Sequence, residues 1–196
     1  GAAHRMNTMI DALIELHGIS AQPISDDPVD LTSMAAEICD ELRNDDSTRE
    51  VDIWIEPNMS CRGDRPLIRI ALFNLIQNAW KYTNKTEDAT IAIDTVSLDD
   101  TRVYRITDNG AGFDMRFADR LFNLFHRLHG QSEFKGTGVG LATVQRVIRR
   151  HGGRVWANSM PGEGASFQFT LWDSNADMIA SQLTDSDDKS SSASGQ

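Results

Sequence analysis

The hydrophobic residues of this chain follow two spacings, one typical of helices and one typical of strands. Apolar side chains that recur every three or four positions predict helices over 4–17, 31–42, 65–83, 116–125 and 138–150. Apolar side chains that recur at every second position predict half-buried strands over 51–55, 90–96, 102–107, 154–158 and 165–172. Helices and hairpin-like strand pairs come in a mixed order, so we expect an α+β fold, a two-layer sandwich in which helices cover a sheet.

Four segments differ in composition and set the expected domain organisation. Residues 1–20 form one apolar-striped helix, and 21–29 is a linker rich in proline and aspartate. Residues 30–172 carry the remaining helix and strand patterns and form the globular domain. The last segment, 173–196, is acidic and rich in serine. Its few apolar residues cannot offset the entropy of ordering, so we expect a disordered tail.

The composition fits one globular domain and narrows the range of partners. A chain of 196 residues with 40% hydrophobic residues can bury a full core. Its net charge of −10 opposes binding to nucleic acid or to anionic membranes, so a phosphate ligand would need cations or a metal close to it. No apolar run approaches the roughly 18 to 20 residues that a membrane-spanning helix needs. The two distant cysteines, Cys39 and Cys61, favour a reducing, cytoplasmic setting.

The helix expected at 65–83 has two chemically different faces. At about 100° per residue, five apolar residues share one face: Ile68, Leu72, Leu75, Ile76 and Ala79. On another face, Asn74, Asn78 and Lys81 fall within about 60° of one another. Two amides and an ammonium group one turn apart can bind a metal-bound polyphosphate. Taken alone, the pattern fits the solvated side of an amphipathic helix better, so other motifs must decide.

Two glycine-rich segments follow this helix. The first, 108–112 (DNGAG), ends a strand; its aspartate can accept a hydrogen bond from an exocyclic amine, and its glycines let a ligand approach the backbone closely. By itself it also fits an ordinary turn. The second, 136–141 (GTGVGL), opens a helix, where free N–H groups and the helix dipole favour phosphate. It lacks the context of a dinucleotide fold and the lysine of a P-loop, which leaves a glycine-rich lid.

Together with one further motif, these segments resemble a known family. In chain order the motifs are Asn74-x-x-x-Asn78-Ala79-x-Lys81-Tyr82-Thr83, Asp108-x-Gly110-x-Gly112, Phe122-x-x-Phe125-x-Arg127 and Gly136-x-Gly138-x-Gly140-Leu141. They resemble the N, G1, F and G2 boxes of sensor histidine kinases, and the resemblance covers residues 30–172. It implies the Bergerat ATP-binding fold of the GHKL ATPase superfamily, preceded at 1–20 by a remnant of the second helix of a dimerisation hairpin.

The resemblance implies a role for each matching residue of the first two motifs. Asn78 would ligate Mg²⁺, Asn74 would support the phosphate end of ATP, and Lys81 would reach a phosphate. Tyr82 would flank the adenine ring, and Asp108 would bind its amino group.

Further residues would complete the nucleotide site. Arg127 would approach the terminal phosphates from the lid and would form the catalytic group with Asn74 and Lys81. Ser166 would contact the adenine through water. The remaining residues expected to contact ATP are those of the glycine motifs: Gly110, Gly112, Gly136, Thr137, Gly138, Val139, Gly140 and Leu141.

Two positions depart from the family pattern. Trp80 stands where a smaller aliphatic residue is usual, and His126 stands where an aromatic residue such as tyrosine is common. We expect Trp80 to pack in the core and His126 to lie on the surface or the lid rather than to act in catalysis.

The residue at position 74 bears on the reaction. Related ATPases that hydrolyse ATP carry a glutamate one helical turn before the metal-binding asparagine, where it activates water. Asn74 cannot act as a general base, so the nucleophile is expected to come from elsewhere, and in histidine kinases it is an imidazole on a separate helical hairpin. Residues 4–17 resemble the second helix of that hairpin. Its first helix, with the acceptor histidine, is absent, and His4 lies on the wrong helix.

The sequence thus predicts an enzyme module, the ATP-binding catalytic domain of a two-component sensor histidine kinase, with ATP and Mg²⁺ as cofactors. It would donate the γ-phosphate to a histidine on a dimerisation domain largely absent from this chain. Two alternatives remain: a nucleotide-binding regulatory module without transfer activity, and an ATP-hydrolysing clamp of the chaperone class. Expected partners are the protein's own phosphoacceptor and sensor domains, a response regulator and a second copy in a homodimer, but no nucleic acid.

Overall fold

The fold consists of helices and strands in mixed order, and the computed structural model describes residues 23–124 and 138–172. Within these ranges the strands are β1 (Asp27–Asp30), β2 (Asp52–Ile55), β3 (Ser60–Gly63), β4 (Thr90–Leu98), β5 (Thr101–Asp108), β6 (Val155–Met160) and β7 (Gly164–Phe169). The helices are α2 (Leu31–Asp45), α3 (Arg65–Tyr82) and α4 (Gly140–Arg150), with a 3-10 helix, η1, at Met115–Arg120. The helix expected at 4–17 and the tail expected at 173–196 lie outside the described residues.

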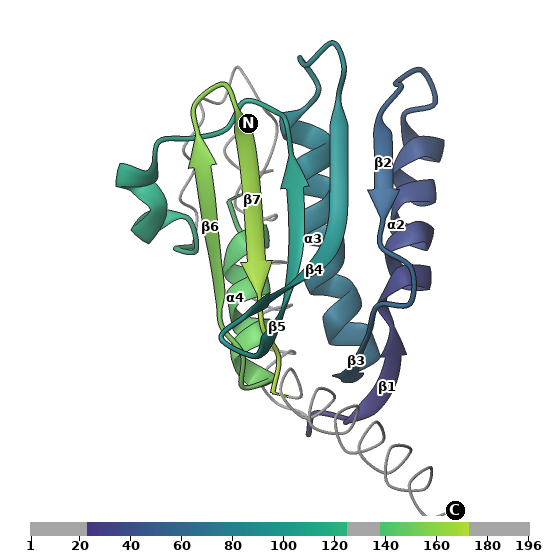
Figure 1. The fold of residues 1–196 in the computed structure, drawn as a ribbon, viewed down its shortest axis with the longest axis vertical. Coiled ribbons are helices and arrows are strands. Elements are labelled where there is room, and N and C mark those ends of the chain that lie inside the picture. Colours follow the sequence, from purple (N-terminus) through teal and green to yellow (C-terminus); the bar gives the residue numbers. More distant parts are fainter. Residues whose placement is uncertain (1–22, 125–137, 173–196) are drawn as a thin grey trace, which may run out of the picture.

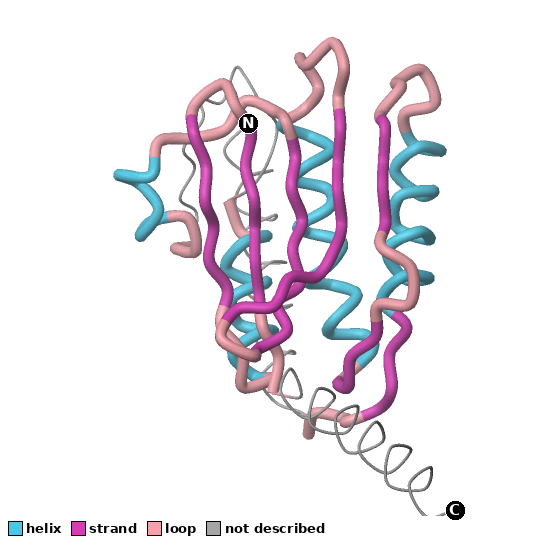
Figure 2. The backbone as a smooth tube through the Cα atoms, in the orientation of Figure 1, coloured by secondary structure: helices cyan, strands magenta, loops and turns pink. Residues whose placement is uncertain are grey.

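Five strands form one sheet, and the helices cover one face of it (Figure 1). The strand order is β2-β4-β5-β7-β6; β2 runs parallel to β4, and the other neighbours are antiparallel. Figure 2 shows the helices as a second layer behind the strands. The expected α+β sandwich is confirmed. In the described part of the chain, no helix is both long enough and apolar enough to cross a membrane.

Aspartates begin the two longer helices. The carboxylate of Asp30 accepts a hydrogen bond from the Ser33 N–H (2.9 Å) at the start of α2. The carboxylate of Asp64 accepts one from the Leu67 N–H (3.1 Å) at the start of α3, and Pro66 occupies the first turn. Each cap satisfies an N–H group that has no partner within its helix. The caps therefore fix where both helices begin, and with that the direction in which the polar face of α3 points.

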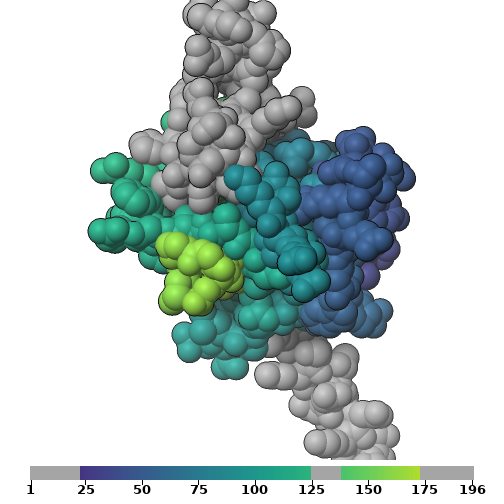
Figure 3. Space-filling model, turned by 90° about the horizontal axis from the view of Figure 1, so that it is seen from above, coloured from purple at the N-terminus to yellow at the C-terminus, as the bar shows by residue number. Residues whose placement is uncertain are grey.

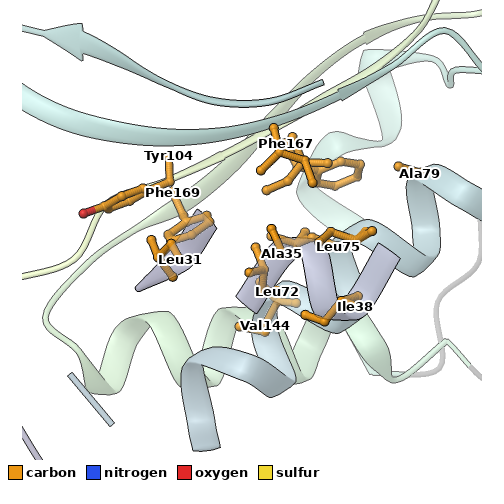
Figure 4. Close-up of a cluster of buried hydrophobic side chains, with 14 of the residues drawn as sticks. Leu31, Ala35, Ile38, Leu72, Leu75, Ala79, Tyr104, Val144, Phe167 and Phe169 are labelled. Carbon is orange, nitrogen blue, oxygen red and sulfur yellow. The ribbon is translucent and has the colours of Figure 1, made fainter. Parts of the chain in front are cut away.

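The core lies between the sheet and the helices. Figure 4 shows Phe167 of the sheet facing Leu75 of α3, with Tyr104 and Phe169 near Leu31 of α2. The rings of Tyr104 and Phe169 stack with centroids 5.2 Å apart. All five apolar residues expected on the buried face of α3 are at most 3% exposed. Trp80 is 7% exposed, so its expected packing role is confirmed.

The pairing of β1 with β3 corrects the expected linker at 21–29. Val29 lies opposite Cys61, and both side chains are buried, so residues 27–29 belong to the folded domain. Each of these strands has only four residues, and only one residue of β1 is buried. Each segment contains a single hydrophobic side chain, Val29 or Cys61, so neither shows a recognisable period-2 pattern, which is why the sequence did not predict the pair.

The α-helix expected at 116–125 is not formed by the described residues, which adopt the 3-10 helix η1 instead. No residue of η1 is buried. Because a short helix gains most of its stability from packing an apolar face, this segment does not extend into an α-helix. The apolar residues that follow, Leu121 and Phe122, pack against the core instead.

His151 links the start of α3 to the end of α4. The imidazole is 0% exposed. Its Nε2 accepts a hydrogen bond from the Asp64 N–H (3.0 Å), so its Nδ1 carries the proton and donates to the Val147 carbonyl oxygen (2.9 Å). The ring therefore holds the two helices together through backbone groups.

Replacing His151 by leucine fills the space of the imidazole with an apolar side chain but leaves the Asp64 N–H without its acceptor. We expect the free energy of unfolding to fall by about 1–3 kcal/mol. Urea unfolding followed by circular dichroism measures this, with Arg43→Ala as the control because Arg43 is half exposed and forms an ion pair with Asp40 in the same helix. A loss below about 0.5 kcal/mol, the usual range of surface substitutions, would contradict the linking role.

Candidate nucleotide-binding site

Several predicted site residues gather at the end of the sheet where α3 and β5 finish and β6 turns into β7. The Ala111 N–H donates to the Tyr82 carbonyl oxygen (3.0 Å), and the Gly162 N–H donates to the Ala111 carbonyl oxygen (2.8 Å). Figure 3 looks onto this end, with the β6–β7 turn in yellow-green. The loop after β5 is thus held between the end of a helix and a hairpin turn.

The glycines of this loop make its close packing possible. A Cβ atom at Gly110 would lie 2.4 Å from the Tyr82 carbonyl oxygen. Gly112 has a φ of +60°, and a Cβ atom there would lie 2.0 Å from the Met160 carbonyl oxygen. A side chain at either position would push the loop away from α3 or from β6. The structure therefore explains why both positions are glycine, whether or not a ligand approaches them.

Asp108 ends β5 and points into the side of the sheet that the helices cover. Its side chain is 5% exposed, and its Oδ1 accepts a hydrogen bond from the Gly110 N–H (2.9 Å). Burial raises the pKa of the carboxyl group to about 6, and the N–H groups of Gly110 and Ala165 offset part of this effect. Such a carboxylate is short of hydrogen-bond donors, and an exocyclic amine would supply one.

The contribution of Ala165 was not predicted. It comes from the backbone N–H, so the residue type at this position carries no signal of it.

The two side-chain amides on the polar face of α3 differ in their hydrogen bonding. The Asn74 side chain donates from Nδ2 to the Ile70 carbonyl oxygen (2.8 Å). The Asn78 amide makes no hydrogen bond to any residue in the described ranges. Its carbonyl oxygen is therefore available for a metal ion, for which oxygen ligands are preferred.

Lys81 and Tyr82 lie against each other at the end of α3. The Lys81 ammonium donates to the Tyr82 hydroxyl (3.0 Å) and lies 4.2 Å from the centroid of its ring. The structure thus brings together the residue expected at a phosphate and the residue expected at the adenine ring.

The start of α4 lies against the polar face of α3. A Cβ atom at Gly140 would lie 2.3 Å from Asn74 Oδ1, so only glycine allows this approach. Val139, at the N-cap, makes no side-chain hydrogen bond to the first turn of α4. The unpaired N–H groups and the positive end of the helix dipole therefore adjoin Asn74, which fits an anionic ligand.

The other predicted lid residues divide between described and undescribed parts of the chain. Gly138 has a φ of +76°, Val139 is buried, and Leu141 packs against the core. Three predicted residues lie outside the described ranges: Arg127, Gly136 and Thr137. His126 lies there too.

Among the described residues, Ser166 lies apart from the Asp108 side of the sheet. It lies opposite Thr107 in the β5–β7 register, and the two hydroxyl oxygens are 3.0 Å apart. Because successive side chains of a strand point to opposite faces, Ser166 lies on the face away from Asp108. The expected water-mediated adenine contact of Ser166 therefore has no support, since the residue opposite Asp108 is Ala165.

The oxygen donors at this site fit a metal ion that is held mainly by the phosphates of a bound nucleotide and by few protein groups. Among the described residues, no group of three or more histidine, cysteine, aspartate or glutamate side chains could hold a metal. Mg²⁺ commonly uses one or two protein oxygens together with phosphate oxygens and water, and Asn78 could supply such an oxygen.

Comparison with known proteins decides the family. The profile described as "Histidine kinase-, DNA gyrase B-, and HSP90-like ATPase" matches residues 63–175 of the chain. The chain belongs to this ATPase family. The match spans α3, the loop after β5 and the start of α4, so it includes every described residue of the predicted site. The expected ATP-binding domain of this superfamily is confirmed, and a sensory kinase is among the similar proteins.

Relatives of the ATPase domain include a cyanobacterial phytochrome and a sensory kinase. Cyanobacterial phytochrome A of Nostoc sp. is 32% identical over 166 residues, which cover 85% of this chain and 22% of that protein. The adaptive-response sensory kinase SasA of Trichormus variabilis is 36% identical over 142 residues, which cover 70% of this chain and 35% of that protein. The chain thus spans about a fifth to a third of the length of these relatives.

Solved structures show the same fold for the ATPase domain. The mycobacterial sensor histidine kinase MprB superposes with a TM-score of 0.62 at 24% identity, over 74% of this chain and 96% of that chain. The full-length kinase ShkA in complex with AMPPNP superposes with a TM-score of 0.67 at 22% identity, over 84% of this chain and 35% of that chain.

If Asp108 binds the adenine amino group as predicted, its raised pKa makes the affinity for adenine nucleotides depend on pH. An amine donor prefers the ionised carboxylate, and the pKa in the ligand-free domain is about 6. Below that pH the carboxyl group must first lose its proton, so we expect the affinity to fall by about tenfold per pH unit between pH 6 and pH 4. Calorimetric titration with adenosine, which has no phosphate to titrate, measures this. An affinity that stays constant from pH 8 to pH 4.5 would contradict it.

Proposed function

We propose that this chain is the phosphate-donor half of a histidine phosphotransfer reaction. It binds ATP with Mg²⁺ and presents the γ-phosphate to a histidine on a dimerisation domain. The observation that carries this proposal is the composition of the polar face of α3, which offers two amides and an ammonium group but no carboxylate of its own. Such a face can bind the metal–phosphate end of ATP, but it has no group that could activate water.

Each residue of the described site has a task in this proposal. Asn78 would give its carbonyl oxygen to Mg²⁺, which when bound neutralises phosphate charge. Lys81 and the N–H groups at the start of α4 would bind phosphate oxygens. Asp108 would hold the adenine amino group and thereby set the position of the whole nucleotide. The domain thus acts by orientation and charge neutralisation, and it forms no covalent bond to the phosphoryl group.

The alternative of a module without transfer activity is not favoured by the described residues. Trp80 departs from the family pattern, but it is a packed side chain on the buried side of α3. Packing in the core therefore accounts for Trp80, and the polar face of α3 is unaffected by it.

The wider setting of the reaction is part of the proposal. The acceptor histidine would belong to the protein's own dimerisation domain, a response regulator would take the phosphate from it, and a sensor domain would control both in a homodimer. A reducing, cytoplasmic location is part of the proposal, and the side chains of Cys39 and Cys61 are both buried.

The test is phosphotransfer from radiolabelled ATP to a full-length partner that carries the hairpin histidine. We expect an acid-labile label on the partner, no label on this chain, and only slow phosphate release by this chain alone. The Asn78→Ala variant serves as the inactive control. A partner that stays unlabelled contradicts the kinase proposal, and steady phosphate release by the chain alone points to a hydrolase instead.

A further inference from the structure

Arg49 connects the loop between α2 and β2 to the end of α3. Its guanidinium donates through Nη1 to the Trp80 carbonyl oxygen and through Nη2 to Thr83 Oγ1 (2.6 Å). Its Cζ lies 4.8 Å from the centroid of the Trp80 ring. Burial lowers the pKa of Arg49 from its ordinary value, which shows that the group is partly removed from water. Three separate contacts therefore tie this arginine to one turn of α3.

These contacts satisfy the last carbonyl groups of α3. Thr83 is the C-cap residue, and its side chain is 0% exposed. Its hydroxyl donates to the Ala79 carbonyl oxygen (2.8 Å), and the Arg49 guanidinium donates to the Trp80 carbonyl oxygen. Carbonyl groups at a helix end have no partner within the helix, and a cation there also complements the helix dipole. The last turn of α3 is thus fixed from outside the helix.

The same turn builds the adenine end of the nucleotide site. Its residues Lys81 and Tyr82 are both predicted to contact ATP, and the Tyr82 carbonyl oxygen accepts the N–H of Ala111 (3.0 Å). Gly110 packs directly on that carbonyl group, and the Gly110 N–H in turn holds Asp108 (2.9 Å). Any shift of the last turn would therefore be passed through the loop to the Asp108 carboxylate.

We propose that Arg49 is a positioning residue of the nucleotide site: it fixes the last turn of α3, and through Tyr82 it fixes the loop that orients Asp108. The inference rests on the nucleotide-binding part of the proposed function. Asn78 lies one turn before the last turn of α3, which Arg49 holds. We therefore expect the loss of Arg49 to weaken binding at the adenine end of the site and to leave Mg²⁺ binding at Asn78 unchanged. No motif of the family includes Arg49, which lies 31 residues before Trp80 in the sequence.

The test compares nucleotide affinities of variants of the whole 196-residue chain. Adenosine, ADP and AMPPNP are titrated by calorimetry at 10 °C, with and without Mg²⁺. Arg49→Ala is expected to weaken all three by about tenfold, with an unchanged ratio between the affinities measured with and without Mg²⁺. Arg43→Ala is the matched arginine control, and His151→Leu is the control for loss of stability alone; both are expected to bind within about twofold of the unaltered chain.

The outcomes separate this inference from the proposed function. Affinities of Arg49→Ala within twofold of the unaltered chain would overturn the positioning role, as would an equal weakening in His151→Leu. A loss of affinity seen only in the presence of Mg²⁺ would also overturn the positioning role. Absence of nucleotide binding by the unaltered chain would instead contradict the proposed function itself.

Discussion

The Asp108→Asn variant is expected to be more stable than the unaltered chain and yet to bind adenine nucleotides about a hundredfold more weakly. Burial raises the pKa of this carboxyl group from 3.8 to about 6, so ionisation is less favourable in the ligand-free fold than in the unfolded chain. A shift of about two pKa units corresponds to at most about 3 kcal/mol above pH 7. An asparagine keeps an acceptor for the Gly110 N–H but carries no charge, so we expect a gain of about 1–3 kcal/mol in the free energy of unfolding.

The sign of the effect fixes its dependence on pH. Because the folded pKa of Asp108 lies above the unfolded value, its stabilising contribution is complete below pH 3.8 and is lost as the pH rises through about 6. The gain from Asp108→Asn should therefore be small at pH 4, grow up to about pH 6 and stay constant above pH 7. Urea unfolding at these pH values measures it, with Asp119→Asn, an exposed carboxylate, as the control.

The loss of affinity in the same variant has a separate cause. An amide at position 108 offers a weaker, uncharged acceptor, and its NH₂ group would face the adenine amino group as a second donor. A hydrogen bond to a charged group contributes about 1.5–3 kcal/mol, or up to about a hundredfold in affinity. An Asp108→Asn variant that binds as well as the unaltered chain, or that loses stability at pH 7.5, would show that Asp108 has only a structural role.

The sequence predicted those parts of the site that lie on one regular element. The two faces of α3 follow from the helical period, and the structure buries the apolar face as expected. Asp108 and the following glycines were also placed correctly at the end of a strand, because the period-2 pattern ends there. Local spacing was sufficient in both cases.

The features that the sequence did not predict depend on contacts between distant segments. The face on which Ser166 lies is set by the register between β5 and β7, and a shift of one residue would reverse it. The strands β1 and β3 each contain one hydrophobic side chain, so they show no alternating pattern. Arg49 comes from an irregular loop, and only the folded chain brings it to the end of α3.

The Asn78→Ala variant is expected to lose the Mg²⁺-dependent part of nucleotide binding without losing stability. In the described residues the Asn78 amide has no hydrogen-bond partner, so its removal leaves no buried group unsatisfied. Alanine also has a higher helix propensity than asparagine, by about 0.5–0.7 kcal/mol, so the free energy of unfolding should stay the same or rise slightly. A loss of affinity therefore cannot come from unfolding.

The ligand dependence of this variant identifies what Asn78 does. If its carbonyl oxygen binds Mg²⁺, AMPPNP should bind to Asn78→Ala with the same affinity with and without Mg²⁺, while adenosine should bind as it does to the unaltered chain. Loss of a metal-binding oxygen typically lowers affinity by at least about tenfold. Gln77→Ala is the matched control, because Gln77 is the adjacent amide on α3 and is exposed. Titration calorimetry compares AMPPNP binding to the two variants. If Mg²⁺ strengthens binding to Asn78→Ala as much as to Gln77→Ala, the metal is bound elsewhere, and the polar face of α3 binds only the phosphates.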